Sequence, residues 1–319
     1  MNDTEVLVQQ LITGLCNGMI IALIALGYTL VYGIIELINF AHGDLVMLGA
    51  FMALTLVAFF DLNGASSGPA AWVGLASLFV IVPAFCAGVN WLADRLAYRP
   101  LRSAPKLSVL VSAIGLSFIF VNLGLFWGGL PLELFGGGNA AAAPKDFPGL
   151  IGNTNLLGAG NVQFTYKDLL VVLITLPAMG LLTYWVKFTT MGKAMRAVAQ
   201  NPTAARLMGI NADRVISITF MVGGALGGLA SVVYALYNNT IYFQMGYRIG
   251  MDAFTAAVLG GIGSLPGAML GGILIGLVRA LTDQYIATMW TNVMVFSILI
   301  LVIIFRPSGL MGAKVKDKV

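Results

Sequence analysis

Long apolar runs dominate this sequence and determine its structural class. A helix that crosses a membrane needs about 20 apolar residues, and six runs come close to that length or exceed it. These runs are Val6–Leu30, Trp72–Leu92, Leu107–Trp127, Leu169–Val186, Val215–Tyr237 and Met289–Phe305, and a weaker seventh is Asp44–Phe60. Residues are 59% hydrophobic and only 9% charged, whereas a soluble domain carries about 25% charged residues. We therefore predict an all-α, polytopic helical membrane protein with a single transmembrane domain over residues 1–319.

The stretch Asp252–Leu281 is also apolar, but helix-breaking residues interrupt it. The interrupting residues are Gly260, Gly261, Gly263, Pro266 and Gly267. Glycine and proline break or kink helices, so the stretch is predicted to form two short helices that meet at a break, or a re-entrant pair. The expected architecture is about seven full spans plus this Gly/Pro-broken helix pair.

Basic residues define an orientation because they concentrate on the cytoplasmic side of membrane proteins. Residues 95–106, 187–214 and 306–318 together hold 13 of the 17 basic residues. The order of the spans places all three segments inside if the N-terminus is outside, so we predict an N-out, C-in topology. The loop 128–167 is then external. Membrane orientation thus explains the net charge of +4 without a nucleic-acid partner.

The acidic N-terminus, Met-Asn-Asp-Thr-Glu, differs from the basic start of a cleaved signal peptide, and the first run is expected to be a retained span. The two cysteines, Cys16 and Cys86, lie in separate apolar runs and are too few for a disulfide framework or a zinc site. They are interpreted as small buried apolar side chains, and no metal site is expected.

The segment 187–214 is a long polar, basic stretch between two spans, and it has helix signals. Asn201 is a helix-capping residue, Pro202 fits the first turn, and Gly209 is a natural left-handed stop. The preceding Gly192–Gln200 also reads as a short helix. We predict two short helices at the cytoplasmic surface.

The residues of these two short helices indicate a built surface. The basic residues Lys193 and Arg196 lie on one face, opposite apolar residues. Ala204 and Ala205 are small enough to permit close approach of another surface, and Arg206 follows them. The alternative is a basic loop that only sets orientation or touches anionic lipid headgroups.

Polar residues near or within the spans are the other candidates for function, since ionisable groups in a membrane are costly. The turn Asn39–Asp44 is interpreted either as a broken helix beside a translocation path or as a tight capped turn that only joins two spans. Its candidate residues are Asn39, His42, Gly43 and Asp44. Gly260, Gly261, Gly263 and Ser264 are candidates for a second wall of the path, although packing alone also explains such glycines.

Three separated motifs resemble one family of membrane transport proteins. They are Ile38–Ala50, the sequence GKAMRAV at 192–198 followed by Asn201-Pro202 and Ala204–Asn211, and Val258–Ala268. In this order, over most of the chain, they resemble the branched-chain amino-acid permeases of ABC importers, and more closely the shorter of the two permease subunits. The helix at 203–209 resembles the importer coupling helix, although Thr203 stands where the general motif has Glu.

The resemblance implies a permease subunit of an ATP-driven importer in the bacterial inner membrane. The implied partners are a second permease, two cytoplasmic ATPases that bind ATP and Mg²⁺, and a periplasmic binding protein. The segment 187–214 would be the coupling segment. This chain has no phosphate-binding loop, since Gly192-Lys193 is followed by Ala, so no cofactor and no enzymatic activity are expected of it.

Three alternatives remain open. A related permease could import urea or short amides. An ion-coupled secondary transporter could relay protons through Glu36, Asp44 and Asp252. An intramembrane enzyme could pair Ser264 with His42, but no nucleophile motif surrounds this serine.

Overall fold

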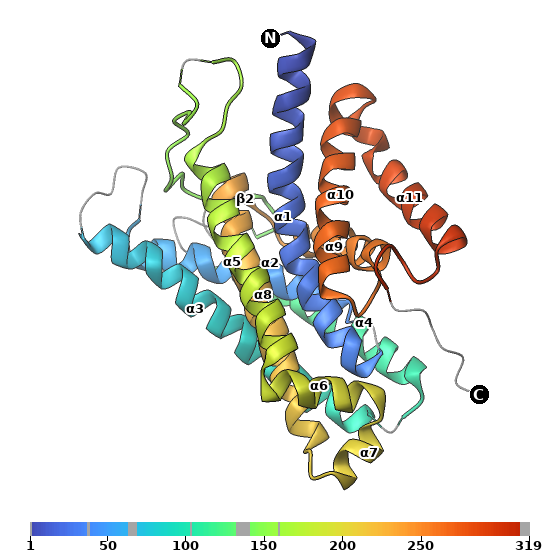
Figure 1. Ribbon diagram of the computed structural model, residues 1–319. Helices are drawn as coiled ribbons and strands as arrows, with labels where there is room; N and C mark the ends of the chain where they lie inside the picture. The colour runs from blue at the N-terminus through green and yellow to red at the C-terminus, as the bar shows by residue number, and fades with distance from the viewer. Residues whose placement is uncertain are drawn as a thin grey trace.

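The computed structural model is a bundle of long helices and describes residues 2–36, 39–62, 69–102, 104–131, 141–158 and 160–312 (Figure 1). Eight helical stretches within these residues are long and apolar enough to cross a membrane. They are α1 (Asp3–Ile35), α2 (Ala41–Phe59), α3 (Pro69–Ala93) with the turns η1 (Asp94–Tyr98) and η2 (Arg99–Leu101), α4 (Lys106–Gly128), α5 (Tyr166–Phe188), α8 (Ala212–Asn238), α10 (Leu265–Tyr285), and η4 (Thr288–Trp290) with α11 (Thr291–Phe305). All seven predicted spans are confirmed as helices, and the protein is a polytopic helical membrane protein.

The shorter elements lie at the ends of this bundle or inside it. They are α6 (Thr190–Gln200), α7 (Pro202–Leu207), α9 (Met245–Gly260), β1 (Lys145–Asp146) and β2 (Thr240–Ile241). Figure 1 shows α6 and α7 together at one end of the bundle, and the N-terminus at the opposite end. We call these the α6–α7 end and the N-terminal end.

Helix α1 is the centre of the fold, and α10 packs directly on it (Figure 1). In the most apolar stretch of α1, 83% of the residues are buried. In the last span, η4 with α11, only 11% of the corresponding residues are buried. A Cβ atom added at Gly18 would lie 2.8 Å from Ile273 Cα, and one at Gly276 would lie 2.3 Å from Gly18 Cα. The backbones of the two helices therefore touch, which is the packing that closely spaced glycines permit.

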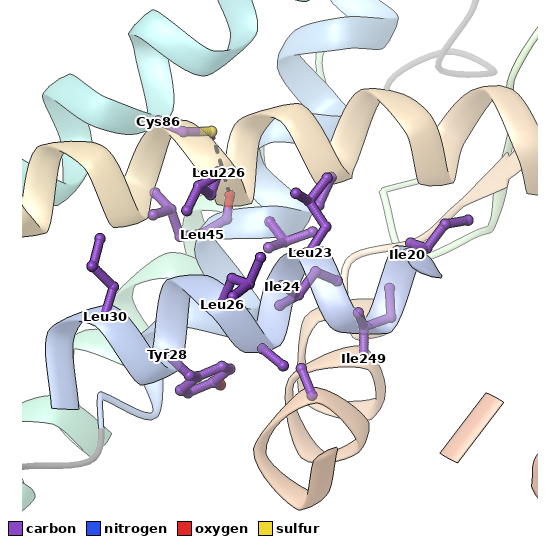
Figure 2. Packing of buried hydrophobic residues seen from close by; sticks show 14 of the residues in the cluster. Ile20, Leu23, Ile24, Leu26, Tyr28, Leu30, Leu45, Cys86, Leu226 and Ile249 are labelled. Atoms are coloured by element: carbon purple, nitrogen blue, oxygen red, sulfur yellow. Dashed lines mark hydrogen bonds between the residues drawn. The ribbon is translucent and has the colours of Figure 1, made fainter. Parts of the chain in front are cut away.

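A second tight contact joins α2, α3 and α8. Figure 2 shows the Cys86 side chain of α3 linked by a dashed line to the backbone of Leu45 in α2, and the Cys86 thiol donates to the Leu45 carbonyl at 3.8 Å. Gly228 makes this approach possible, since a Cβ atom there would lie 2.7 Å from Pro83 Cα. Cys86, like Cys16, is a buried free cysteine, as the sequence predicts.

The broken pair consists of α9 and α10, and the predicted limits of Asp252–Leu281 are too narrow at both ends. The break itself falls at residues 261–264, as expected. Helix α9 has 16 residues and covers about 24 Å at 1.5 Å per residue, which is less than the ~30 Å of a bilayer core. Helix α10 is long enough to span. The two helices are therefore unequal, which a glycine count does not reveal.

The described part of the loop 128–167 lies toward the N-terminal end (Figure 1). Its strand β1 pairs antiparallel with β2, with Lys145 opposite Ile241. Farther along, Asn155 bridges Thr165, and the Leu156 amide donates to the Phe164 carbonyl at 2.8 Å. These contacts form a small hairpin in this part of the loop. Residues 132–140 of the predicted external loop, Ala159, and the basic tail from residue 313 lie outside the described residues.

Candidate functional site

The predicted coupling segment 187–214 forms α6 and α7, and the residues predicted to begin and end α7 do so. The Asn201 side chain accepts hydrogen bonds from the amides of Thr203 and Ala204, both at 3.0 Å, and Pro202 occupies the first turn of α7. Gly209 has a φ of 82°, which favours glycine. The α7 cap and stop are therefore properties of the local sequence.

Helix α7 presents two large apolar side chains away from the bundle. Leu207 is 85% exposed and Met208 is 83% exposed, while Ala205 is 4% exposed and anchors the helix. Ala204 is exposed beside them. The sequence analysis missed Leu207 and Met208 because two apolar residues in a short helix look like core. Their position just before Gly209, where α7 ends, was the feature of the sequence that could have indicated their exposure.

Helix α6 is docked on the bundle by its apolar face. Met195 is 3% exposed and Val198 is fully buried, while Lys193 is exposed on the other face, as predicted. Arg196 is also exposed, but its guanidinium donates to the carbonyl of Val186 at the end of α5. Arg196, one of the predicted coupling residues, thus bonds the coupling segment to α5.

An ion-pair network connects α7 with the nearby ends of α3 and α8. Arg206 of α7 lies 3.7 Å from Asp213 at the start of α8, and Asp213 also pairs with Arg102 at 2.5 Å. Arg102 in turn pairs at 2.5 Å with the fully buried Asp94. Ser217 of α8 donates to Asp94 at 2.5 Å. Charged contacts therefore link α7 to the ends of two spans.

The turn before α2 holds the second group of predicted site residues, and Asn39 has a structural role there. The Tyr98 hydroxyl donates to the Asn39 Oδ1 atom at 2.7 Å, and both residues are buried. Helix α2 begins after Phe40 without a side-chain cap. The turn is therefore not capped by Asn39 or Asp44, because both side chains reach partners on other helices.

His42 is enclosed between α1, α2 and α8. It is 1% exposed, and its ring packs edge-on against Tyr28 with centroids 4.8 Å apart. Gly27 and Gly227 make room for the ring, since added Cβ atoms would lie 2.3 Å and 3.3 Å from it. Neither ring nitrogen has a hydrogen-bond partner among the described residues. His42 therefore does not pair with Ser264, which instead caps α10 by accepting from the Gly267 amide at 3.2 Å.

Asp44 lines a cavity of about 690 Å³ between α1, α2, α4 and α9. The residue is only 2% exposed, and its Oδ2 atom accepts a hydrogen bond of 2.5 Å from Ser117 of α4. Its Oδ1 atom has no hydrogen-bond partner among the described residues. Gly43 packs on the α9 backbone, where an added Cβ atom would lie 2.3 Å from the Gly246 carbonyl oxygen.

The remainder of this cavity is mainly apolar and aromatic, with one basic residue. Its walls include Tyr28 of α1, Phe40, Phe118 of α4, and Arg248 and Met251 of α9. In Figure 2, Tyr28 projects from the lower side of α1 in the view, the side on which α9 also lies. A mostly apolar cavity of this size with a few polar groups is typical of a small-molecule site.

The second predicted wall, Gly260–Ser264, does not line this cavity. The freed carbonyls of the break are bonded by the C-terminal segment: Leu310 donates to Leu259 and Met311 donates to Gly260, each at 2.9 Å. Gly261 (φ 105°) lies against the same segment, since an added Cβ atom would lie 2.4 Å from the Gly312 nitrogen.

Gly263 lines a different cavity, of about 80 Å³, at the joint between α10 and the coupling segment. Met195 and Arg196 of α6 share it. The break is therefore occupied by protein contacts and borders the coupling segment.

A polar cavity of about 250 Å³ lies between α1, α8, α9 and α10. Arg279 and Asp252 form an ion pair of 3.1 Å across it, and Asp283 accepts a hydrogen bond from Thr291. Arg279 thus pairs with Asp252 of α9 and not with Asp283, which follows it by one turn along α10. Arg248 lines both this cavity and the larger one.

Comparison with known proteins agrees with this architecture. The family described as branched-chain amino acid transport system, permease component, matches residues 10–304. The high-affinity branched-chain amino acid transport system permease protein LivH of Escherichia coli K12 is 38% identical over 313 residues, which cover 98% of this chain and 97% of that protein. BraD of Pseudomonas aeruginosa, a permease of the same description, is 37% identical over 98% of this chain and 97% of its own length. A probable permease named LivM, of Methanocaldococcus jannaschii, is 29% identical over 140 residues, 40% of this chain and 41% of that protein.

Proposed function

The chain belongs to the permease family of branched-chain amino acid transport systems, and from that premise we propose that it is one transmembrane subunit of an ATP-driven importer of leucine, isoleucine, valine or closely related amino acids. Its place is the bacterial inner membrane, with the α6–α7 end in the cytoplasm. The distribution of basic residues supports this orientation.

The proposed assembly contains four further subunits around this one. A second permease completes the translocation path, two cytoplasmic ATPases bind ATP and Mg²⁺, and a periplasmic binding protein delivers the amino acid. The partial similarity to a second type of permease supports a paired arrangement. Membrane lipid covers the remaining apolar outer faces, such as that of α11.

The observation that carries the proposal is the exposed tip of α7. A capped helix holds Leu207 and Met208 away from the bundle, and Gly209 ends it in an open left-handed turn. Large apolar side chains that stand in water are costly unless a partner covers them. An ATPase groove at the cytoplasmic surface would cover them and couple nucleotide-driven closure to α5 and α8.

The network through Arg206, Asp213 and Arg102 supplies the route from this tip into the membrane. Closure of the ATPases would move α6 and α7, and the charged contacts would pull on α3 and α8. A shift in the equilibrium between two states requires that nucleotide favour one of them. The buried Asp94 makes the end of this route stiff, because its charge is held by both Arg102 and Ser217.

Cysteine cross-linking tests the proposed contact. The native Cys16 and Cys86 are buried, so an introduced surface cysteine reports on its own position. After purification of the tagged chain in mild detergent, Leu207→Cys should cross-link to a co-purifying ATPase. Leu157→Cys, at an exposed site in the hairpin of the N-terminal end (59% exposed), is the matched control and should not. Cross-linking from Leu157→Cys alone would contradict the assignment.

Energy coupling separates this proposal from an ion-driven transporter. Uptake of leucine into proteoliposomes with all subunits should require ATP and persist when an ionophore collapses ion gradients. Gly209→Val should abolish uptake while leaving the protein inserted, because a β-branched residue is strained at this φ. Uptake that needs no ATP and is lost with the ionophore would overturn the proposal.

A further inference from the structure

The cavity beside Asp44 is lined by one acidic and one basic side chain. The Asp44 carboxylate is buried, and its Oδ1 atom lacks a partner among the described residues. Arg248 of α9, which also lines the cavity, is exposed and makes no hydrogen bond or ion pair with the part of the chain that the structure describes. The charge of Arg248 acts on Asp252, one helical turn along α9, but the ion pair of Asp252 is with Arg279 at 3.1 Å.

An unpaired carboxylate in a buried site is costly, and proteins retain such groups mainly where a ligand or partner satisfies them. Asp44 and Arg248 do not pair with each other, although they line one cavity. The ligand that satisfies both carries a cation and an anion on one small molecule. An α-amino acid at neutral pH has this composition.

We propose that this cavity is the transit site for the zwitterionic amino acid. Asp44 accepts hydrogen bonds from the α-ammonium group, and Arg248 pairs with the α-carboxylate. The aliphatic side chain lies against Phe40, Phe118 and Met251. This assignment rests on the proposed function and adds to it the residues that recognise the substrate.

Gly246 lets the α9 backbone pack directly against Asp44. A Cβ atom at this position would lie 2.5 Å from the Asp44 Oδ1 atom, so any side chain there would displace the carboxylate. The Ser117 hydroxyl meanwhile fixes the other oxygen at 2.5 Å. One oxygen is thus held in place by Ser117, and the other is buried without a hydrogen-bond partner among the described residues.

The same charges discriminate between substrate classes. Urea and short amides are neutral, so they would leave Asp44 and Arg248 without ionic partners. A zwitterion with an apolar side chain satisfies both charges and the aromatic walls. The site therefore favours aliphatic amino acids over the neutral solutes that share their small size.

Photoaffinity labelling of the complete transporter locates the substrate directly. The probe is a diazirine analogue of leucine, delivered by the binding protein to the reconstituted complex and illuminated during turnover. Labelled peptides should contain Phe40, residues 114–121 or residues 242–251, and excess unlabelled leucine should suppress them. Labelling confined to the second permease, or to other segments of this chain, would overturn the site.

Charge-removing variants test the two roles. Asp44→Asn preserves the shape and the bond to Ser117, and Arg248→Gln removes the cation. Each should lower leucine uptake roughly tenfold to a hundredfold, as expected for the loss of a charge-assisted hydrogen bond, with assembly unchanged. Arg248→Lys should recover part of the activity. Matched controls are the exposed Asp146→Asn and Arg306→Gln, which should transport like the unmodified protein.

A cavity-filling variant covers the case in which the charge variants fail to assemble. Val121→Trp places an indole in the cavity from the α4 side, and it should block both labelling and uptake. If the unmodified complex takes up no branched-chain amino acid, the proposed function itself is wrong and the site falls with it. Suppose instead that the unmodified complex transports normally, that these variants transport equally well, and that labelling misses the cavity. Only the proposed transit site is then wrong.

Discussion

The two interrupted segments, Asn39–Asp44 and Gly260–Ser264, look alike in sequence but differ in how their polar groups are satisfied. At the first, the Asp44 carboxylate keeps one oxygen without a partner and faces a cavity of about 690 Å³. At the second, the C-terminal segment bonds the freed carbonyls of Leu259 and Gly260. A break in a membrane helix is therefore informative about function only when its polar groups remain unpaired.

The largest effect is expected from Gly261→Ala. A Cβ atom at this position would meet the Gly312 nitrogen at 2.4 Å, and its φ of 105° is strained for any other residue. The cost in folding free energy should be on the order of 3 kcal/mol, from overpacking and backbone strain together. The measurement is thermal unfolding of the purified protein, with the amount assembled in membranes as a second readout.

Gly263→Ala is the matched control for that variant. Gly263 has a similar φ of 91°, but nothing lies within 4 Å of an added Cβ atom. Gly263→Ala should therefore lose only the part of the folding free energy that backbone strain accounts for, about 1 kcal/mol. Equal losses in the two variants would show that contact with the C-terminal segment does not stabilise the break.

Truncation of the C-terminus tests the same contact from the other side. A chain that ends at Gly309 lacks the Leu310 and Met311 amides that bond α9, and it should lose about 2 kcal/mol because acceptors are left unsatisfied. A chain that ends at Gly312 retains both bonds and should unfold like the full-length protein. In the shorter chain, Gly261→Ala should cost less than in the full-length chain, since the closest clash partner, Gly312, is gone and only the Ser308 carbonyl oxygen at 2.8 Å remains.

The smallest effect is expected at Asn39, the structural member of the first break. Tyr98→Phe removes the hydroxyl that donates to Asn39 at 2.7 Å, and it should cost about 1 kcal/mol of stability. The rate of leucine uptake per assembled transporter should remain close to that of the unmodified protein. A large loss of uptake without a loss of stability would place Asn39 in the translocation path.

The sequence predicts well the features that depend on local chemistry. The seven spans follow from apolar length, and the α7 ends follow from Asn201, Pro202 and Gly209, because caps and turns need only neighbouring residues. The position of the helix break also follows from its glycines.

Features that depend on distant partners could not be predicted. The segment that bonds the break lies some 50 residues later in the chain, and Arg279 takes its partner Asp252 from another helix. Asp44 was a candidate from its polarity alone, but its unpartnered oxygen and the cavity are visible only in three dimensions. Exposure of Leu207 and Met208 likewise depends on how α7 leaves the bundle.

The most direct measurement is the initial rate of leucine uptake per assembled transporter, in parallel proteoliposomes of the unmodified protein, Asp44→Asn and Gly261→Ala. Asp44→Asn should assemble in normal amount and transport roughly tenfold or more slowly, because it loses a contact with the substrate. Gly261→Ala should assemble poorly, while the transporters that do assemble work at the normal rate. The reverse pattern, with normal uptake through Asp44→Asn and slow uptake per assembled Gly261→Ala transporter, would contradict the division of roles between the two breaks.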